Sequence, residues 1–111
     1  ESTEWSRAKL TARERACFWL GLMRFKGRGG PPNPAEGRRL IERASDGKLP
    51  EAMTARAMLL LTGDPEAREI GPTPGPDDAT ARYLLERAAD AGNKDAAAVL
   101  PALKQRQGER P

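Results

Sequence analysis

The side chains that most often perform catalysis are scarce in this sequence. Its 111 residues include no histidine and a single cysteine, Cys17. General acid–base and nucleophilic catalysis usually depend on such groups held close together. Asp77 and Asp78 could pair as an acid and a base, but capping and the helix dipole already explain acidic residues at a helix start. We therefore predict that the chain is not an enzyme and has no catalytic residue, metal ligand or cofactor.

The basic residues lack the arrangement expected of a nucleic-acid-binding protein. The 19 basic and 16 acidic residues are spread along the chain and leave a net charge of +3, whereas nucleic-acid binding usually shows clustered Lys and Arg beside stacking aromatics. The densest basic stretch outside the termini is Arg24, Lys26 and Arg28. Residues 27–30 could cradle an anion, but a turn between repeats explains them better, because the glycine recurs at Gly63 without the rest of the motif.

Composition favours a soluble helical domain. Ala, Leu, Arg and Glu are abundant while β-branched and aromatic residues are few, which favours helix over strand. No apolar run approaches the ~20 residues of a membrane span. We expect neither a membrane-spanning segment nor a small-molecule substrate. The first residue is Glu1 and not Met, which fits either a trimmed chain or a mature chain that has lost a signal peptide.

The sequence contains an internal repeat. Residues 40–52 align without a gap on residues 84–96, so that Arg43-Ala44 falls on Arg87-Ala88. Upstream, residues 16–27 and 52–63 share the same spacing of apolar and small residues. The second copy therefore carries a Pro-rich and Gly-rich insertion, residues 64–76. Repeats of this length are typical of helical solenoids.

Capping signals divide each repeat into helices. A first helix is predicted from Thr11, which forms a capping box with Glu14, to about Lys26. Residues 1–10 could add a turn of helix around Trp5 or could fray. Four more helices follow, from Asn33 to Asp46, from Pro50 to Gly63, from Asp77 or Asp78 to about Gly92, and from Asn93 to about Arg106, with Pro101 shortening or kinking the last. Residues 16–23 are apolar all the way round, which predicts that the first helix lies between neighbours.

These elements predict an all-α fold, a short α-solenoid of helix-turn-helix repeats with about five helices in a right-handed superhelix. We expect a single domain over residues 1–111. Its first repeat covers about residues 12–47, its second about residues 48–92, and a C-terminal capping helix residues 93–106. Gly21 and Ala57 are expected where two helices approach closely, and Gly27 and Gly63 where the chain leaves a helix with positive φ.

Residues 16–29 resemble the first half of a Sel-one-like repeat, a relative of the tetratricopeptide repeat. That family has an Ala, a Leu-Gly four residues on, a Gly-x-Gly turn, and a second helix that ends in Ala-Ala-x-x-Gly. Residues 88–92 repeat this ending. The resemblance covers about residues 12–106. The chain departs from the family pattern at Arg24 (Tyr in the family), Gly37 (Ala), Arg56 (Leu) and Pro101 (Gly), which indicates degenerate repeats.

The resemblance implies a protein-binding module whose concave face is lined by the first, third and fifth helices. By analogy with tetratricopeptide repeats, the predicted partner-binding residues are Arg15, Phe18, Leu22, Phe25, Lys26, Glu51, Thr54, Met58, Thr62, Asp95, Gln105 and Arg106. Two alternatives stay open. Phe18 and Leu22 could be covered by the N-terminal segment that carries Trp5, and the insertion at residues 64–76 could be the binding surface or a tolerated surface loop.

Relatives implied by this resemblance include bacterial adaptors and immunity proteins that neutralise toxic effectors of type VI secretion. A small single domain fits a stand-alone inhibitor better than a large scaffold. We therefore expect an immunity protein bound to an effector toxin, located in the periplasm, with the cytoplasm as the other possible location. A regulatory or envelope-assembly adaptor is the competing function, and an enzyme is a remote one.

Overall fold

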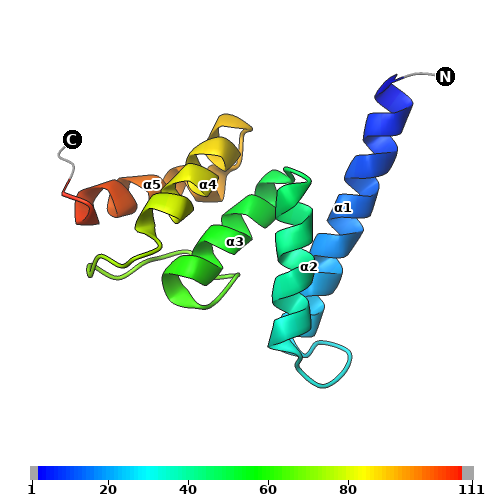
Figure 1. Ribbon diagram of the computed structural model, residues 1–111, viewed down its shortest axis with the longest axis horizontal. Helices are drawn as coiled ribbons and strands as arrows, with labels where there is room; N and C mark the ends of the chain where they lie inside the picture. Colours follow the sequence, from blue (N-terminus) through cyan, green and yellow to red (C-terminus); the bar gives the residue numbers. More distant parts are fainter. Residues whose placement is uncertain (1–2, 109–111) are drawn as a thin grey trace.

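A computed structural model describes residues 3–108 of the chain, with side chains described from residue 10 onward. These residues form five helices and no strand: α1 (Thr3–Lys26), α2 (Pro34–Asp46), α3 (Pro50–Thr62), α4 (Asp78–Asp90) and α5 (Lys94–Arg106). Figure 1 shows the helices following one another across a flat molecule with extents of 48 × 38 × 19 Å. The predicted all-α solenoid of about five helices is confirmed.

Local capping chemistry explains most helix boundaries. The side chain of Asn33 accepts a hydrogen bond from the Glu36 N–H at 3.2 Å, and Asn93 accepts one from the Ala96 N–H at 2.9 Å. Each bond satisfies an amide donor that the first turn would otherwise leave free. Gly63 ends α3 with φ of 82°, a conformation that glycine adopts without steric cost. These three predicted boundaries are confirmed.

The predicted start of the first helix is wrong. The helix begins at Thr3, so Thr11 and Glu14 lie inside it and do not form a capping box at its start. Residues 6–10 are mostly good helix formers, and a helix propagates through a possible cap when the residues before it are also helical. The side chain of Trp5 lies outside the described residues. At the other end of the chain, α5 continues through Pro101 to Arg106.

Helices α1 and α2 pack at unusually short range where two glycines meet. A Cβ atom added to Gly37 would lie 2.6 Å from the backbone nitrogen of Phe25 and 2.7 Å from the carbonyl oxygen of Gly21. A Cβ on Gly21 would lie 3.0 Å from the carbonyl oxygen of Gly37. The predicted close approach at Gly21 is confirmed, and Gly37, a departure from the family pattern, is its partner.

The core has two parts, and α3 belongs to both. Ala52, Ala55 and Leu59 of α3 pack with α1 and α2, while Met53 and Met58 pack with α4 and α5. A helix covered on two sides must be apolar on two sides, which accounts for the nearly continuous apolar sequence of α3.

The expectation that the first helix lies between neighbours is wrong. Helix α1 stands at the end of the row (Figure 1). On its uncovered side Trp19, Leu20 and Met23 are 57%, 40% and 42% exposed. The helix flanked on both sides is α3. Both α1 and α3 have apolar residues on all sides, so this pattern alone does not distinguish a helix in the middle of the stack from one at its end.

Candidate protein-binding surface

A hollow of about 230 Å³ opens where α1, α3, the segment after α3 and the start of α5 converge. We call it the concave hollow. Segments far apart in the sequence build it, and the stacking of the two repeats brings them together. Its lining comprises Phe18, Trp19, Leu22, Glu51, Thr54, Ala55, Pro65, Glu66, Ala67, Arg68, Asn93 and Asp95.

The floor of the concave hollow is apolar and its wall is aromatic. Phe18, Leu22 and Ala55 are almost fully buried, and Phe18 and Leu22 also belong to the core shared by α1, α2 and α3. The Trp19 ring stands beside Phe18, with the two ring centroids 5.5 Å apart and tilted by 54°. The Thr54 hydroxyl donates to the Pro50 carbonyl at 3.0 Å and adds no unpaired polar group to the floor. A rigid apolar floor of this kind suits an apolar side chain of a partner.

The rim of the concave hollow is predominantly acidic. Its charged residues are Glu51, Glu66, Asp95 and Arg68. Arg68 lies 3.7 Å from Asp95, and both side chains are largely exposed. Such an exposed pair contributes little free energy and is easily exchanged. Glu51 forms no ion pair with any residue that the structure describes. Glu66 is already paired with Lys26 and Arg28, so the rim offers a cationic partner group the carboxylate of Glu51 and, by exchange with Arg68, that of Asp95.

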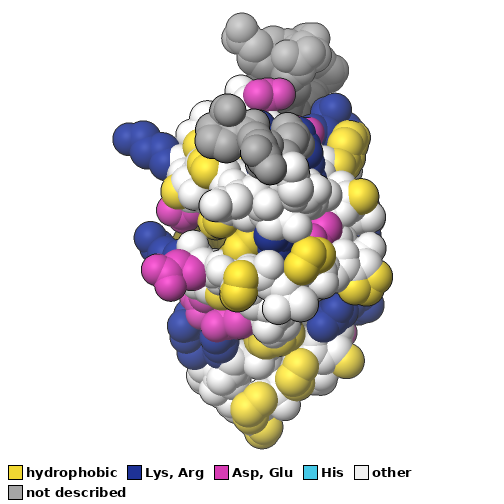
Figure 2. All heavy atoms as spheres, turned by 90° about the vertical axis from the view of Figure 1, so that its left-hand side faces the viewer, with side chains coloured by type: hydrophobic (Ala, Val, Ile, Leu, Met, Phe, Trp, Pro, Cys, Tyr) yellow, Lys and Arg dark blue, Asp and Glu magenta, His cyan; other side chains and the backbone are white. Residues whose placement is uncertain are grey.

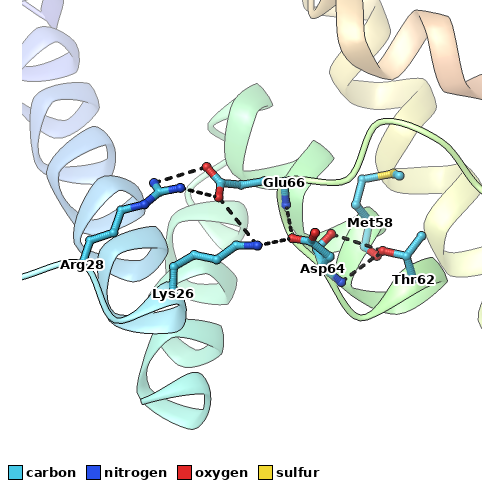
Figure 3. A network of polar contacts seen from close by, with 6 residues as sticks. All are labelled: Lys26, Arg28, Met58, Thr62, Asp64 and Glu66. Atoms are coloured by element: carbon cyan, nitrogen blue, oxygen red, sulfur yellow. Dashed lines mark hydrogen bonds and ion pairs between the residues drawn. The ribbon is translucent and has the colours of Figure 1, made fainter. Parts of the chain in front are cut away.

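A polar clamp of Lys26, Arg28, Asp64 and Glu66 fixes one side of the hollow (Figure 3). Lys26 Nζ lies 2.9 Å from Asp64 Oδ1, and Arg28 donates to Glu66 Oε1 at 2.9 Å. The hydrogen bond from Lys26, helped by one from the Glu66 N–H, holds the pKa of Asp64 below its usual value. Thr62 Oγ1 accepts from the Asp64 N–H at 3.0 Å. The clamp ties the end of α1 to the segment that forms the opposite wall.

A buried ion pair fixes the far end of the same segment. Arg106 donates to Asp78 through Nε at 3.0 Å and Nη2 at 2.6 Å, and through Nη1 to the Gly71 carbonyl at 3.1 Å. Only 7% and 8% of the Arg106 and Asp78 side chains are exposed. The bidentate bond from Arg106 holds the pKa of Asp78 below its usual value. The segment of residues 63–77 is thus held to α1 at one end and to α5 at the other.

The structure separates the predicted partner-binding residues into four groups. Phe18, Leu22, Glu51, Thr54 and Asp95 line the concave hollow. Met58 is 1% exposed in the core, so its side chain is not available to a partner. Lys26, Thr62 and Arg106 hold the 63–77 segment in place. Lys26 and Arg106 contact the insertion across 38 and 35 residues of sequence, which the repeat pattern does not encode, while Thr62 accepts from the Asp64 amide only two residues on. Arg15, Phe25 and Gln105 lie outside the hollow, and Phe25 is half-buried against the core.

The analogy with tetratricopeptide repeats, which selects residues from one face of each helix, does not include several residues of the hollow. Trp19 is not among the predicted partner-binding residues, because an all-round apolar helix is expected to be covered on more than one side; its position next to Phe18 is the signal that could have identified it. Pro65, Ala67 and Arg68 belong to the insertion, which the sequence allows either as a binding surface or as a tolerated surface loop. Helix residues and insertion residues line the same hollow.

The remaining chemistry of the described residues is sparse. Over residues 10–108, whose side chains the structure describes, no group of three or more Cys, Asp or Glu side chains is placed to hold a metal ion. Within residues 3–108, no helix has the length and apolar character needed to cross a membrane. Arg28, the centre of the glycine-rich turn, is paired with Glu66. On the face at the α5 end, Figure 2 shows positive and negative side chains close together, without a field of one sign.

Comparison with known proteins identifies the repeat. No curated protein sequence and no solved structure matches the chain. A family model described as Sel1 repeat matches residues 14–48 and residues 50–93. Repeats of this kind generally mediate protein–protein interaction and are typically not enzymes. Because the two matches cover most of the chain and coincide with its two helical hairpins, the chain belongs to the Sel1 repeat family.

Proposed function

We propose that the chain binds a protein partner by taking one segment of it into the concave hollow. The observation that carries this proposal is the convergence of α1, α3, α5 and the 63–77 segment on one hollow with an apolar floor. The clamp and the Arg106–Asp78 pair hold its walls in position. A preformed site of this kind needs little ordering on binding, which preserves affinity.

The chemistry of the hollow specifies the segment. Its floor of Phe18, Leu22 and Ala55 accepts an apolar side chain, and its carboxylates attract a neighbouring Lys or Arg. Opposite charges across an interface steer association and discriminate between partners. We therefore expect the partner segment to present an apolar residue next to basic residues.

Selection from a random peptide library displayed on phage tests this proposal. Peptides retained by the wild-type protein should share an apolar residue beside Lys or Arg. A variant carrying Glu51→Lys and Asp95→Lys should bind them at least ~10-fold more weakly, because two attractive charges become repulsive. Asp77→Lys is the matched control, since Asp77 is not part of the hollow and should leave binding unchanged. Enrichment of acidic peptides, or equal binding by the Glu51/Asp95 variant, would refute the proposal.

The narrower role of immunity protein rests on the family resemblance alone and is proposed on that basis. It requires that the partner be a secreted toxic effector and that co-expression of this chain restore growth to cells that produce the toxin in the periplasm. Fractionation of the native cells tests the periplasmic location. A partner that is a resident regulatory or envelope-assembly protein would instead assign the adaptor role.

A further inference from the structure

A second surface, distinct from the concave hollow, lies on the uncovered side of α1. A recess of about 260 Å³ between α1 and α2 is lined by Arg13, Glu14, Ala16, Cys17, Leu20, Leu40 and Arg43. A second recess of about 250 Å³ lies at the end of α1 and is lined by Met23, Arg24, Arg28, Gly29, Gly30 and Pro31. We call the two recesses and the ridge between them the outer track.

The two recesses form one continuous strip along the helix. Leu20 lines the first recess, Met23 lines the second, and residues three apart are neighbours on a helix surface. Ala16 precedes Leu20 by one turn and leaves room for close approach of another backbone. From Ala16 to Met23 the strip is roughly 10 Å long at 1.5 Å per residue. Exposed apolar side chains gathered in this way on a folded chain indicate an interaction site.

The charges along the outer track are mainly positive. Arg13 and Arg43 border the first recess and Arg24 borders the second, and none of the three forms an ion pair with a residue in the described part of the chain. The acidic groups nearby are Glu14, which lines the first recess, and Glu36, which is paired with Arg39. Arg28 is already paired with Glu66. The track therefore has an excess of arginines with free hydrogen-bonding capacity.

We propose that the outer track docks an acidic amphipathic helix of a protein partner. Apolar side chains one turn apart on that helix would fill the two recesses, and its flanking carboxylates would meet Arg13, Arg24 and Arg43. Charge complementarity selects this occupant. A second copy of the chain would bring two arginine-lined faces together, and a flat lipid surface would leave the recesses unfilled. The partner requirement is opposite to that of the concave hollow, whose rim is acidic.

A designed helical peptide is the probe. It carries Leu at positions spaced by three and four residues, with Glu on both flanks, and its control replaces every Glu with Lys. Fluorescence anisotropy of the labelled Glu peptide should show saturable binding that weakens with added salt, while the Lys peptide should not bind. Cys17 provides an independent readout, because it lines the first recess and is the only cysteine. Bound peptide should slow its alkylation by iodoacetamide several-fold.

Variants locate the binding and separate it from the concave hollow. The double variant Leu20→Gln, Met23→Gln changes only exposed side chains. It should lower the affinity for the Glu peptide at least ~10-fold, because the apolar contact is removed. Tyr83→Gln, at a residue that is 56% exposed on α4, is the matched control and should have no effect. Arg13→Gln with Arg24→Gln should reduce both affinity and salt dependence. The Glu51/Asp95 variant should bind the Glu peptide normally, so that failure of one site is distinguishable from failure of the other.

Three outcomes would overturn the proposal. Absence of binding, or equal binding by the Leu20/Met23 variant, would show that the outer track does not take an acidic helix. Sedimentation of the protein as a dimer that the Leu20/Met23 variant abolishes would assign the track to a second copy. Co-sedimentation with phosphatidylserine-containing vesicles, lost in the same variant, would assign it to a membrane surface.

Discussion

The glycine contact between α1 and α2 makes a quantitative prediction for Gly37→Ala. The added methyl group would lie 2.6 Å from the Phe25 nitrogen and 2.7 Å from the Gly21 oxygen. Ordinary contact requires about 3.5 Å, so one helix must move away by roughly 0.8 Å. Both opposing atoms belong to backbone and cannot rotate aside. The strain therefore spreads into the packing of Phe18 and Ile41 behind the contact.

Two opposing free energies set the size of the effect. Overpacking a well-packed contact costs about 1–3 kcal/mol, while Ala in place of a helical Gly gains up to about 1 kcal/mol in helix propensity. We expect a net loss of about 1–2 kcal/mol in the free energy of unfolding. For a chain of this length that corresponds to a fall in Tm of about 4–8 °C.

Thermal unfolding followed by circular dichroism at 222 nm, with urea unfolding as a second measurement, checks this value. Gly21→Ala should cost less, because its new Cβ would meet its nearest neighbours at 3.0 Å. Gly71→Ala is the control, with no atom within 4 Å of the added group, and should change Tm little. If Gly37→Ala were as stable as the wild type, the close approach of α1 and α2 described above would be refuted.

Three further predictions concern single polar groups. Ser45→Ala should raise the free energy of unfolding by about 1 kcal/mol, measured by urea unfolding, because the buried Ser45 hydroxyl has no hydrogen-bond partner in the described structure. Arg106→Gln should destabilise the fold by about 3 kcal/mol at neutral pH by leaving Asp78 buried without its partner. The ion pair lowers the pKa of Asp78 in the folded protein, so its stabilisation of the fold is complete above the unfolded pKa of about 4. It is lost as the pH falls through the folded pKa, and the unfolding free energies of the wild type and the Arg106 variant should therefore become equal in acid. Asn93→Ala should cost about 1 kcal/mol through loss of its cap, whereas Asp77→Ala, whose side chain caps no amide, should cost less in the same unfolding assay.

Local chemistry in the sequence accounts for most of the fold. Asn33 and Asn93 at helix starts and Gly63 at a helix end act within a few residues of their own position, so their effect is readable from the sequence. The internal repeat then places the hairpins in order. The start of α1 was missed because Thr11 and Glu14 form a capping pattern that a continuous helix also tolerates. No residue at that position distinguishes the two structures.

The site was less predictable, because the residues that organise it interact across the insertion. Lys26, Thr62 and Arg106 lie at positions where a regular repeat faces its groove, and helix projection assigned them to binding for that reason. Residues 63–77 engage all three, by pairing Lys26 with Asp64, Thr62 with the Asp64 amide, and Arg106 with the Gly71 carbonyl. The contacts of Lys26 and Arg106 depend on where the insertion folds, which no periodic pattern specifies, whereas the Thr62 bond is a local turn at the end of α3.

The two proposed surfaces follow from one feature of the stack. Because α3 is covered on both sides, it provides only part of one hollow, whereas α1 contributes one side to the concave hollow and leaves the opposite side uncovered. Trp19 lies on the boundary, with its ring beside Phe18 in the hollow and one turn before Met23 of the outer track. Two occupants with opposite charge would therefore meet near Trp19. Because opposite charges attract, each peptide should bind more tightly in the presence of the other than alone, and added salt should abolish this mutual enhancement.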